Sequence, residues 1–257
     1  MMAHYQEMRH SRWDARVAVL VAALLVVAFP WSPSPGGSLA AQAPPAEADP
    51  LAKLEEALAA KPDDLRAGND YRMAIIKAGQ YDRGLEFFKQ LVASHPSSAN
   101  AHLNYGFQYV DKIPVAGSIT QVILANNALT EFSTSLELQP SWIGYYTRGN
   151  SYLFWPRIFG RTKLGIADLE EALKIQKAEP KRGYHVRVYI ALGDGHFKMD
   201  DIEKATALWK EGLTQFPDNE PLKRRLSAHG DAVKLLLDDV YDPNKRVDTS
   251  LQDLWAN

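Results

Sequence analysis

The fold is decided by residues 186–219, which read VRVYIALGDGHFKMDDIEKATALWKEGLTQFPDN. Large apolar side chains recur in this stretch at helical spacing, in two successive runs. Small residues at Gly193, Ala205 and Gly212 allow two helix backbones to approach each other closely. Pro217 removes a backbone donor and pushes its predecessor out of helical geometry, so it ends the second run. The pattern predicts two short amphipathic helices packed back to back.

This spacing, over about 34 residues, resembles the tetratricopeptide repeat (TPR) motif. The resemblance lies in the small, aromatic and proline positions, whereas Tyr189 stands where the motif prefers Trp and His196 where it prefers Tyr. One helix pair cannot bury its apolar face alone, so we expect the rest of the chain to repeat the unit.

Three further copies precede this one, and they span residues 65–98, 99–141 and 142–180. A half unit stands before them at residues 51–62, and residues 220–240 form an apolar stripe suited to a closing helix, which Gly230 can kink or split. The resemblance implies an all-α fold. The fold it implies over residues 51–240 is an α-solenoid of about four stacked helix-turn-helix repeats, with a half repeat before them and a capping helix after them.

Two features depart from this regular pattern. Arg72 stands where the motif expects a small residue, which should weaken the contact of its helix. Residues 241–257 form a polar tail that contains an apolar cluster of Leu251, Leu254 and Trp255. That cluster is able to dock back onto the solenoid.

The N-terminus has the pattern of an export signal. Three arginines precede an apolar run of about 13 residues, Val17–Phe29, and small residues follow it, as in a secretory signal peptide. A membrane-spanning helix usually needs roughly 20 apolar residues. We therefore expect residues 1–40 to be a signal peptide cleaved after Ala40 or Ala41, with an uncleaved membrane anchor as the alternative. Residues 41–50 are rich in Ala, Pro and acidic side chains and are expected to form a disordered linker.

Composition excludes several function classes. The formal net charge is −2, so the chain lacks the concentrated Lys and Arg of a nucleic-acid surface. Cysteine is absent, which removes disulfides, iron–sulfur sites and cysteine nucleophiles. None of the seven histidines forms a tight metal-ligand pair, and adjacent acidic residues on a helix point about 100° apart. We expect no catalytic residue, metal or cofactor.

The resemblance implies a groove lined by the first helix of each repeat. The residues expected there are Asn69, Phe107, Tyr146, Asn150, Arg187, Asp194 and Lys198. Asn side chains can bond both amide groups of an extended peptide. Asn150 and Arg187 resemble part of the clamp with which some family members hold a C-terminal carboxylate, but the full set is missing. The alternative is that the apolar members simply pack against neighbouring helices.

A second candidate surface comes from two turns that are longer than the motif allows, DKIPVAGSIT at residues 111–120 and LFWPRIFGRTK at residues 153–163. Both join a first helix to a second helix, so they should emerge on the same edge. The residues of this edge patch are Ile113, Trp155, Arg157, Ile158, Phe159 and Arg161. Apolar patches rimmed by charge often mark interaction sites. The alternative is that both turns fold inward and extend the core.

Together these features predict an exported, non-catalytic scaffold that holds a peptide segment or another protein. We expect it to be periplasmic or extracellular, as an assembly factor or subunit of a cell-envelope complex. A membrane-anchored adaptor that faces the periplasm is the alternative, and membrane contact is expected only if the N-terminal segment is retained. An envelope enzyme is a third and more remote class.

Overall fold

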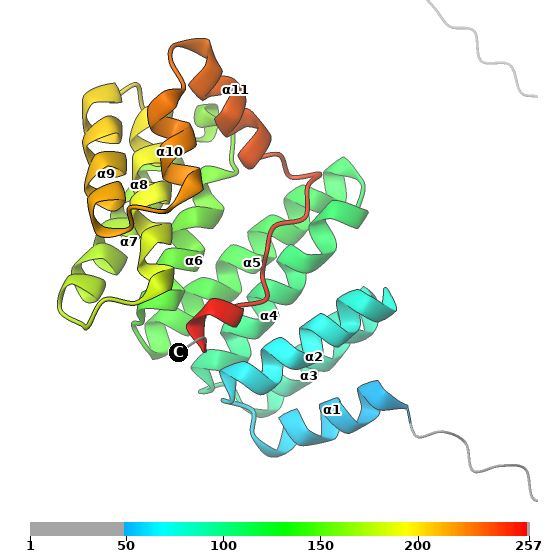
Figure 1. Cartoon of the computed structure of the whole chain (residues 1–257). Coiled ribbons are helices and arrows are strands. Elements are labelled where there is room, and N and C mark those ends of the chain that lie inside the picture. Colours follow the sequence, from blue (N-terminus) through cyan, green and yellow to red (C-terminus); the bar gives the residue numbers. More distant parts are fainter. Residues whose placement is uncertain (1–48, 256–257) are drawn as a thin grey trace, which may run out of the picture. The chain divides into compact units, whose positions relative to one another are not determined.

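The structure is a computed structural model that describes residues 49–255, all of them in helices, turns and irregular segments without a β-strand (Figure 1). The predictions for residues 1–40 and for the linker up to residue 48 lie outside the described residues. The helices are α1 (Pro50–Ala60), α2 (Leu65–Ala78), α3 (Tyr81–Ser94), α4 (Ala99–Lys112), α5 (Ser118–Leu138), α6 (Trp142–Leu153), α7 (Thr162–Lys177), α8 (Val186–Lys198), α9 (Ile202–Gln215), α10 (Glu220–Ser227) and α11 (Asp231–Val240). Within these residues no helix is both long enough and apolar enough to cross a membrane.

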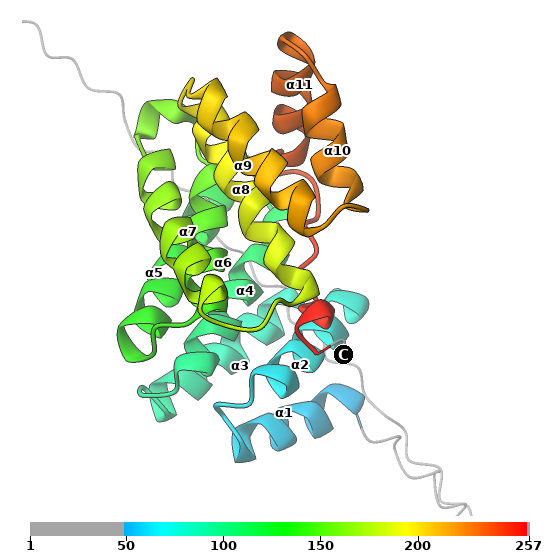
Figure 2. The same cartoon turned by 60° about the vertical axis from the view of Figure 1, so that its left-hand side comes forward.

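The helices pack in consecutive pairs, which confirms the predicted repeats. The pairs α2–α3, α4–α5, α6–α7 and α8–α9 form one repeat each, and α1 packs on α2 as the half repeat. The first helices, α2, α4, α6 and α8, lie on one side of the stack, and the second helices lie on the other (Figures 1 and 2). We call the two sides the first-helix face and the second-helix face.

Local sequence explains where the helices begin. The residues whose side chains accept a hydrogen bond from the first turn of a helix are Asp49, Asp64, Ser98, Ser141, Asp201 and Asn219. These caps satisfy amide groups that have no partner within the helix. Asp49 caps α1 and Pro50 opens it, because proline suits the first helical position. Asp49 and Pro50, which the prediction assigned to the linker, therefore belong to the start of α1.

Glycine allows the two helices of a repeat to touch. A Cβ on Gly193 of α8 would lie 2.1 Å from Nε1 of Trp209 on α9, and one on Gly106 of α4 would lie 2.3 Å from the ring of Phe132 on α5. Only glycine fits where a neighbouring aromatic ring reaches the backbone so closely. The aromatic and small positions of the motif are thus partners in one contact.

The irregular parts differ from a regular repeat in three ways. The long turn after α4 is mostly helix, because α5 begins at Ser118 and runs for 21 residues. Two short 3-10 turns, η1 (Ile113–Val115) and η2 (Arg157–Phe159), form the rest of the insertions. The closing helix is split into α10 and α11 at Gly230, which has a φ of +57°. The C-terminal segment, residues 242–255, follows Tyr241 at the end of α11.

Candidate binding face

The C-terminal segment lies across the first-helix face. In Figures 1 and 2 it runs from α11 past α4 and α5 and ends beside α2, with a last 3-10 turn, η4 (Gln252–Leu254). It contacts α2 through Arg72, α4 through Asp111 and α8 through Arg187. The predicted groove is therefore the surface on which the chain places its own end.

The centre of this face is a buried ion pair. Nη1 of Arg72 donates to Oδ2 of Asp111 at 2.8 Å, and both side chains are fully buried. Nη2 donates to Oδ1 of Asn69 at 3.0 Å and to the carbonyl oxygen of Thr249 at 2.9 Å, while Nε donates to Asn104 at 3.1 Å. The hydroxyl of Thr249 donates to Asp111. The C-terminal segment thus supplies one acceptor and one donor to a cluster built by α2 and α4.

As the departure from the motif predicts, α2 packs on its partner α3 less extensively than the first helices of the other repeats pack on theirs. Arg72 makes its contacts on the first-helix face instead. Its guanidinium carbon lies 4.6 Å from the centre of the Phe107 ring, a cation–π contact. Burial lowers the pKa of Arg72, and the charge of Asp111 opposes that shift. A guanidinium keeps its charge under such conditions because its ordinary pKa lies far above neutral pH. The predicted groove residues Asn69 and Phe107 therefore contact the buried guanidinium of Arg72 and stabilise its charge.

An apolar pocket beside the ion pair holds Leu251. The side chain is 5% exposed and belongs to one cluster with Leu103, Phe107 and Phe132. Leu254 and Trp255 pack partly against the same cluster, as expected for the apolar end of the tail. Phe107 therefore packs in the core, as the alternative expected, and belongs to the same cluster as Leu251 of the C-terminal segment.

Arg187 binds two carboxylates of the segment. Its Nε donates to Oδ2 of Asp253 at 2.8 Å, and Nη2 lies 3.7 Å from Oδ2 of Asp248. Tyr146 stands beside it against Leu251 and Asp253. Partial burial would raise the pKa of Asp248, but hydrogen bonds from Ser250 and the charges of Arg187 and Arg72 hold it below its usual value. The positive charge of the face thus acts on this end of the segment.

The α8 end of the predicted groove is closed by the cap. Asp194 is fully buried and accepts two hydrogen bonds from Arg225 of α10, at 2.6 Å each, and one from the hydroxyl of Tyr241 at 2.9 Å. Lys198 donates to the carbonyl of Leu153 and lies 4.2 Å from the Tyr241 ring. Burial lowers the pKa of Lys198. Asp194 is therefore a structural partner of the cap, whereas Asn150 stays half-buried on α6.

The edge patch is at the surface. Ile158 is 89% exposed and Phe159 is 60% exposed, and no residue of η1 or η2 is buried. The alternative that both turns fold inward is wrong for these residues, although Ile113 and Trp155 are half-buried. Arg161 lies 3.6 Å over the Trp155 ring. Arg157 pairs with Asp200 at the turn between α8 and α9.

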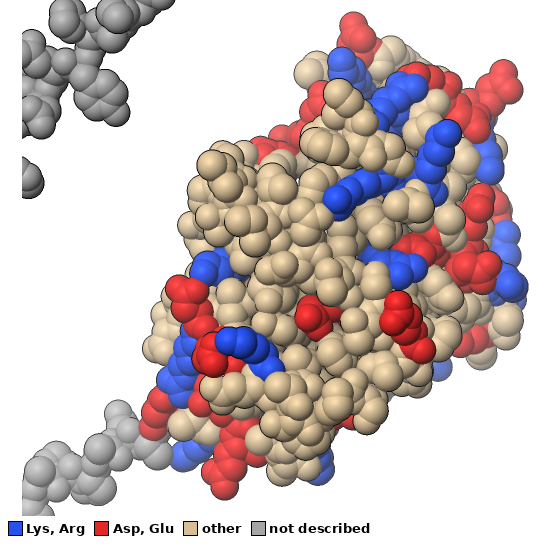
Figure 3. Space-filling model, turned by 180° about the vertical axis from the view of Figure 1, so that it is seen from behind, with Lys and Arg blue, Asp and Glu red and all other residues tan. Residues whose placement is uncertain are grey.

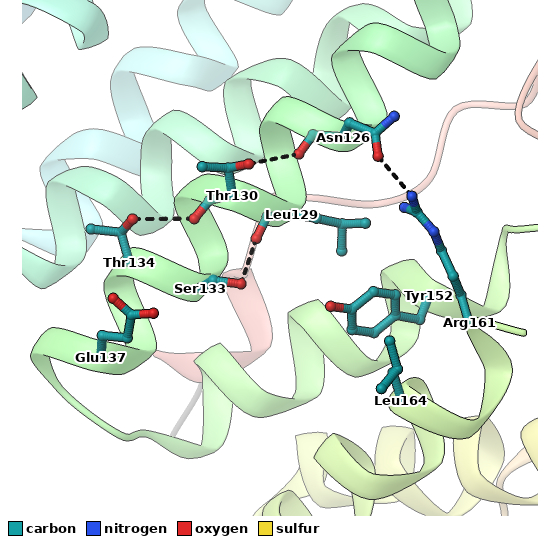
Figure 4. Close-up of a pocket in the computed structure, with 9 residues that line it drawn as sticks. All are labelled: Asn126, Leu129, Thr130, Ser133, Thr134, Glu137, Tyr152, Arg161 and Leu164. Carbon is teal, nitrogen blue, oxygen red and sulfur yellow. Dashed lines mark hydrogen bonds between the residues drawn. The ribbon is translucent and has the colours of Figure 1, made fainter. Parts of the chain in front are cut away.

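The second-helix face continues this patch. Figure 3 shows a broad uncharged area on the side opposite to that of Figure 1, broken by only a few charged side chains. The α5 residues Ile119, Val122 and Ile123 are 82%, 51% and 53% exposed. Between α5 and α7 lies an open groove of about 490 Å³, in which Arg161 donates to Asn126 (Figure 4). The groove is lined by Asn126, Leu129, Thr130, Ser133, Thr134, Glu137, Tyr152, Arg161 and Leu164.

Sequence reasoning missed two parts of these surfaces. Residues 118–130 contain no charged side chain over more than three helical turns, and this was the available signal for the α5 side. The anomalous Arg72 and the acidic Asp111 were the signals for the buried ion pair. Nothing near Thr249 in the sequence indicates its role, since it lies 177 positions from Arg72.

Comparison with known proteins places the fold. No family model matches the sequence. A solved structure titled TTC0263, a thermophilic TPR protein in Thermus thermophilus, aligns with a TM-score of 0.52 and 22% identity over 69% of this chain and 87% of that one. Two structures of MamA protein align with TM-scores of 0.45 at 15% and 19% identity, over 70% of this chain and 85% and 87% of theirs. The described residues form a TPR-like repeat fold.

Proposed function

We propose that this protein is an exported, non-catalytic scaffold that binds an extended segment of another protein on its first-helix face. One observation carries the proposal: that face already holds an extended segment, the end of the chain itself. It does so through a backbone carbonyl on Arg72, carboxylates on Arg187 and a leucine in an apolar pocket. Such contacts are those by which proteins bind peptides. TPR-like folds support a protein-binding role.

The binding role is tested by crosslinking from the face itself. A photo-crosslinking amino acid at Asn150, which is half-buried on α6, should capture a partner segment in the cells of origin. The same group at Lys210, exposed on α9, is the matched control. Mass spectrometry of the crosslinked peptides separates a partner from the chain's own end. Equal yields of partner at both positions would contradict the proposal.

Export is proposed on the signal pattern of residues 1–40. The protein would then act in the cell envelope, as an assembly factor or a subunit of an envelope complex. A mature chain that begins at residue 41 or 42 in the envelope fraction is the expected result of N-terminal mass spectrometry. An intact Met1 in the membrane fraction would instead favour the alternative, an adaptor tethered by an uncleaved segment.

The edge patch is the second candidate surface for the same role. Ile158 and Phe159 are more than half exposed beside the cationic Arg157 and Arg161. Large apolar side chains in water next to arginines are typical of interaction sites. A crosslinking group at Ile158 tests this surface separately from the one at Asn150.

A further inference from the structure

We propose that the C-terminal segment is a displaceable ligand of the first-helix face and that it resembles the partner segment that replaces it. This inference rests on the proposed function and names the chemistry of the partner. The expected partner is an extended segment with a carboxylate followed directly by a hydroxyl residue, then a leucine, then a second carboxylate. In this chain those positions are Asp248, Thr249, Leu251 and Asp253.

The segment is bound in the way a peptide ligand is bound, by a few buried residues within an extended and mostly solvent-exposed chain. From Asp242 to Trp255 only Thr249 and Leu251 are buried, and the other residues are half-buried or exposed. Apart from η4 the segment has no regular structure. Its remaining contacts with the repeats are the pairs of Asp248 and Asp253 with Arg187, the packing of the half-buried Leu254 and Trp255, and pairs such as Arg246 with the hydroxyl of Tyr81. A segment with two anchors can leave without opening the repeats.

The buried ion pair of the first-helix face keeps its other hydrogen bonds when the segment leaves. Without Thr249, Arg72 still donates to Asp111, Asn69 and Asn104, so no buried charge loses its counterion. Nη2 of Arg72 and a carboxylate oxygen of Asp111 would then face water as one donor and one acceptor. These two groups match the carbonyl and the hydroxyl of an incoming residue such as Ser or Thr.

The backbone of the anchor residue gives a competitor an advantage. Leu251 has a φ of +53°, a left-handed conformation that is unusual for a residue with a branched side chain. The chain holds this strain because Leu251 reaches the apolar pocket in that conformation. A partner that places a leucine in the same pocket with a relaxed backbone avoids the strain. The connection to α11 acts in the opposite direction, since it keeps the segment at high local concentration.

The test uses the chain with and without its own end. A chain that stops at Pro243 is titrated with a labelled peptide of residues 244–257, NKRVDTSLQDLWAN, and binding is followed by fluorescence anisotropy. We expect the shortened chain to bind the peptide on the order of 100-fold more tightly than the full chain does. A peptide with Leu251→Ala should bind at least about tenfold more weakly, since one buried side chain is lost. A peptide with Asp253→Asn should bind up to about fivefold more weakly, since it loses one partly exposed ion pair. A peptide with Gln252→Ala should bind normally, because Gln252 is exposed.

Two results would overturn the inference. The first is a shortened chain with a native helical circular dichroism spectrum that does not bind the peptide. If the shortened chain does not fold, the full chain with both Leu251→Ala and Asp253→Asn replaces it, and the second overturning result is a folded double variant that binds the peptide no better than the unchanged chain. A partner crosslinked at Asn150 that lacks the pattern would overturn this inference and leave the proposed function intact.

Discussion

The two candidate surfaces differ in what covers them. The first-helix face contains a buried ion pair between Arg72 and Asp111 and is covered by the C-terminal segment. The edge patch contains apolar side chains in water, with Ile158 89% exposed. The cover of the first surface comes from outside the repeats, whereas the second surface comes from insertions within them. The face proposed to bind a ligand is therefore covered by a segment from outside the motif, and the exposed apolar surface is formed by insertions into the motif.

The difference also separates stability from binding. On the first-helix face the Arg72–Asp111 pair is fully buried, so removal of either charge should change the free energy of unfolding. On the edge patch the side chains are hydrated, so their removal should change binding only. Each prediction below tests this division, and the largest expected effect comes first.

The Arg72→Ala variant should lose about 3–5 kcal/mol of stability, because it leaves the Asp111 carboxylate buried without its counterion. Urea unfolding followed by circular dichroism measures the loss. The control is Arg187→Ala, whose partly exposed pairs with Asp248 and Asp253 should contribute about 1 kcal/mol or less. Equal losses for the two variants would contradict the division between a buried pair and a marginal one.

A double variant sharpens this first comparison. Arg72→Met combined with Asp111→Leu removes both charges together and keeps apolar volume in the same space. It should recover most of the stability lost in Arg72→Ala, since a buried ion pair is often no more stabilising than a packed apolar pair. A double variant as unstable as Arg72→Ala would show that the polar contacts with Asn69 and Asn104 matter more than the charge balance.

Leu251→Ala should release the C-terminal segment while the repeats stay folded. Loss of the buried side chain removes about 2 kcal/mol of apolar burial, which corresponds to roughly 30-fold faster amide exchange in the segment. Hydrogen exchange with mass spectrometry measures this for residues 246–255, and exchange in α2 to α9 should change little. Gln252→Ala is the matched control, because Gln252 is exposed. Faster exchange throughout the repeats would show that the segment is part of the core.

Most of the fold could be predicted because the repeat is a local pattern. Helical periodicity and capping residues such as Asp64 and Ser98 are readable within a few positions, and α2 to α9 follow them. The same pattern placed Arg187 on the first-helix face correctly. Its partners Asp248 and Asp253 are more than 60 positions away and lie in a segment without periodicity.

The long-range contacts could not be predicted for the same physical reason. Asp194 occupies a groove position in the motif, but α10 brings Arg225 onto it, and α11, which follows the break at Gly230, brings Tyr241 onto it. The direction of a chain after a break depends on what it packs against rather than on the residues of the break. A groove position therefore indicates a face of the molecule and not its occupant.

The next effect in size depends on pH. His102 of α4 has both ring nitrogens next to acceptors, with Nδ1 2.6 Å from Glu131 of α5 and Nε2 3.2 Å from the carbonyl of Pro96. The hydrogen bond with Glu131 raises the pKa of His102, although burial lowers it. The stabilising contribution is therefore complete below the unfolded pKa of about 6.5 and is lost as the pH rises through the raised pKa of the folded state.

His102→Gln should remove this dependence. At pH 6 the unchanged chain should be more stable than the variant by about 1–2 kcal/mol, as for a hydrogen bond with a charged group, and the difference should shrink by pH 9. Urea unfolding at both pH values measures it. This contact joins the two helices of one repeat and lies on neither surface. The variant therefore measures what a single half-buried pair contributes to the free energy of unfolding. A difference that grows with pH would show that His102 is neutral in the fold.

The smallest change in stability is expected at the edge patch. Ile158→Ser together with Phe159→Ser should leave the free energy of unfolding within about 0.5 kcal/mol, because both side chains are largely in water. Trp155→Ser should cost more, about 1 kcal/mol, since Trp155 is half-buried beneath the guanidinium of Arg161. If the patch binds a partner, the Ile158 and Phe159 double variant loses crosslinking from a group placed at the neighbouring exposed Lys163, while crosslinking from Asn150 persists. A double variant that unfolds instead would mean that these side chains stabilise the repeats, and the division between a covered stabilising face and an open binding edge would be wrong.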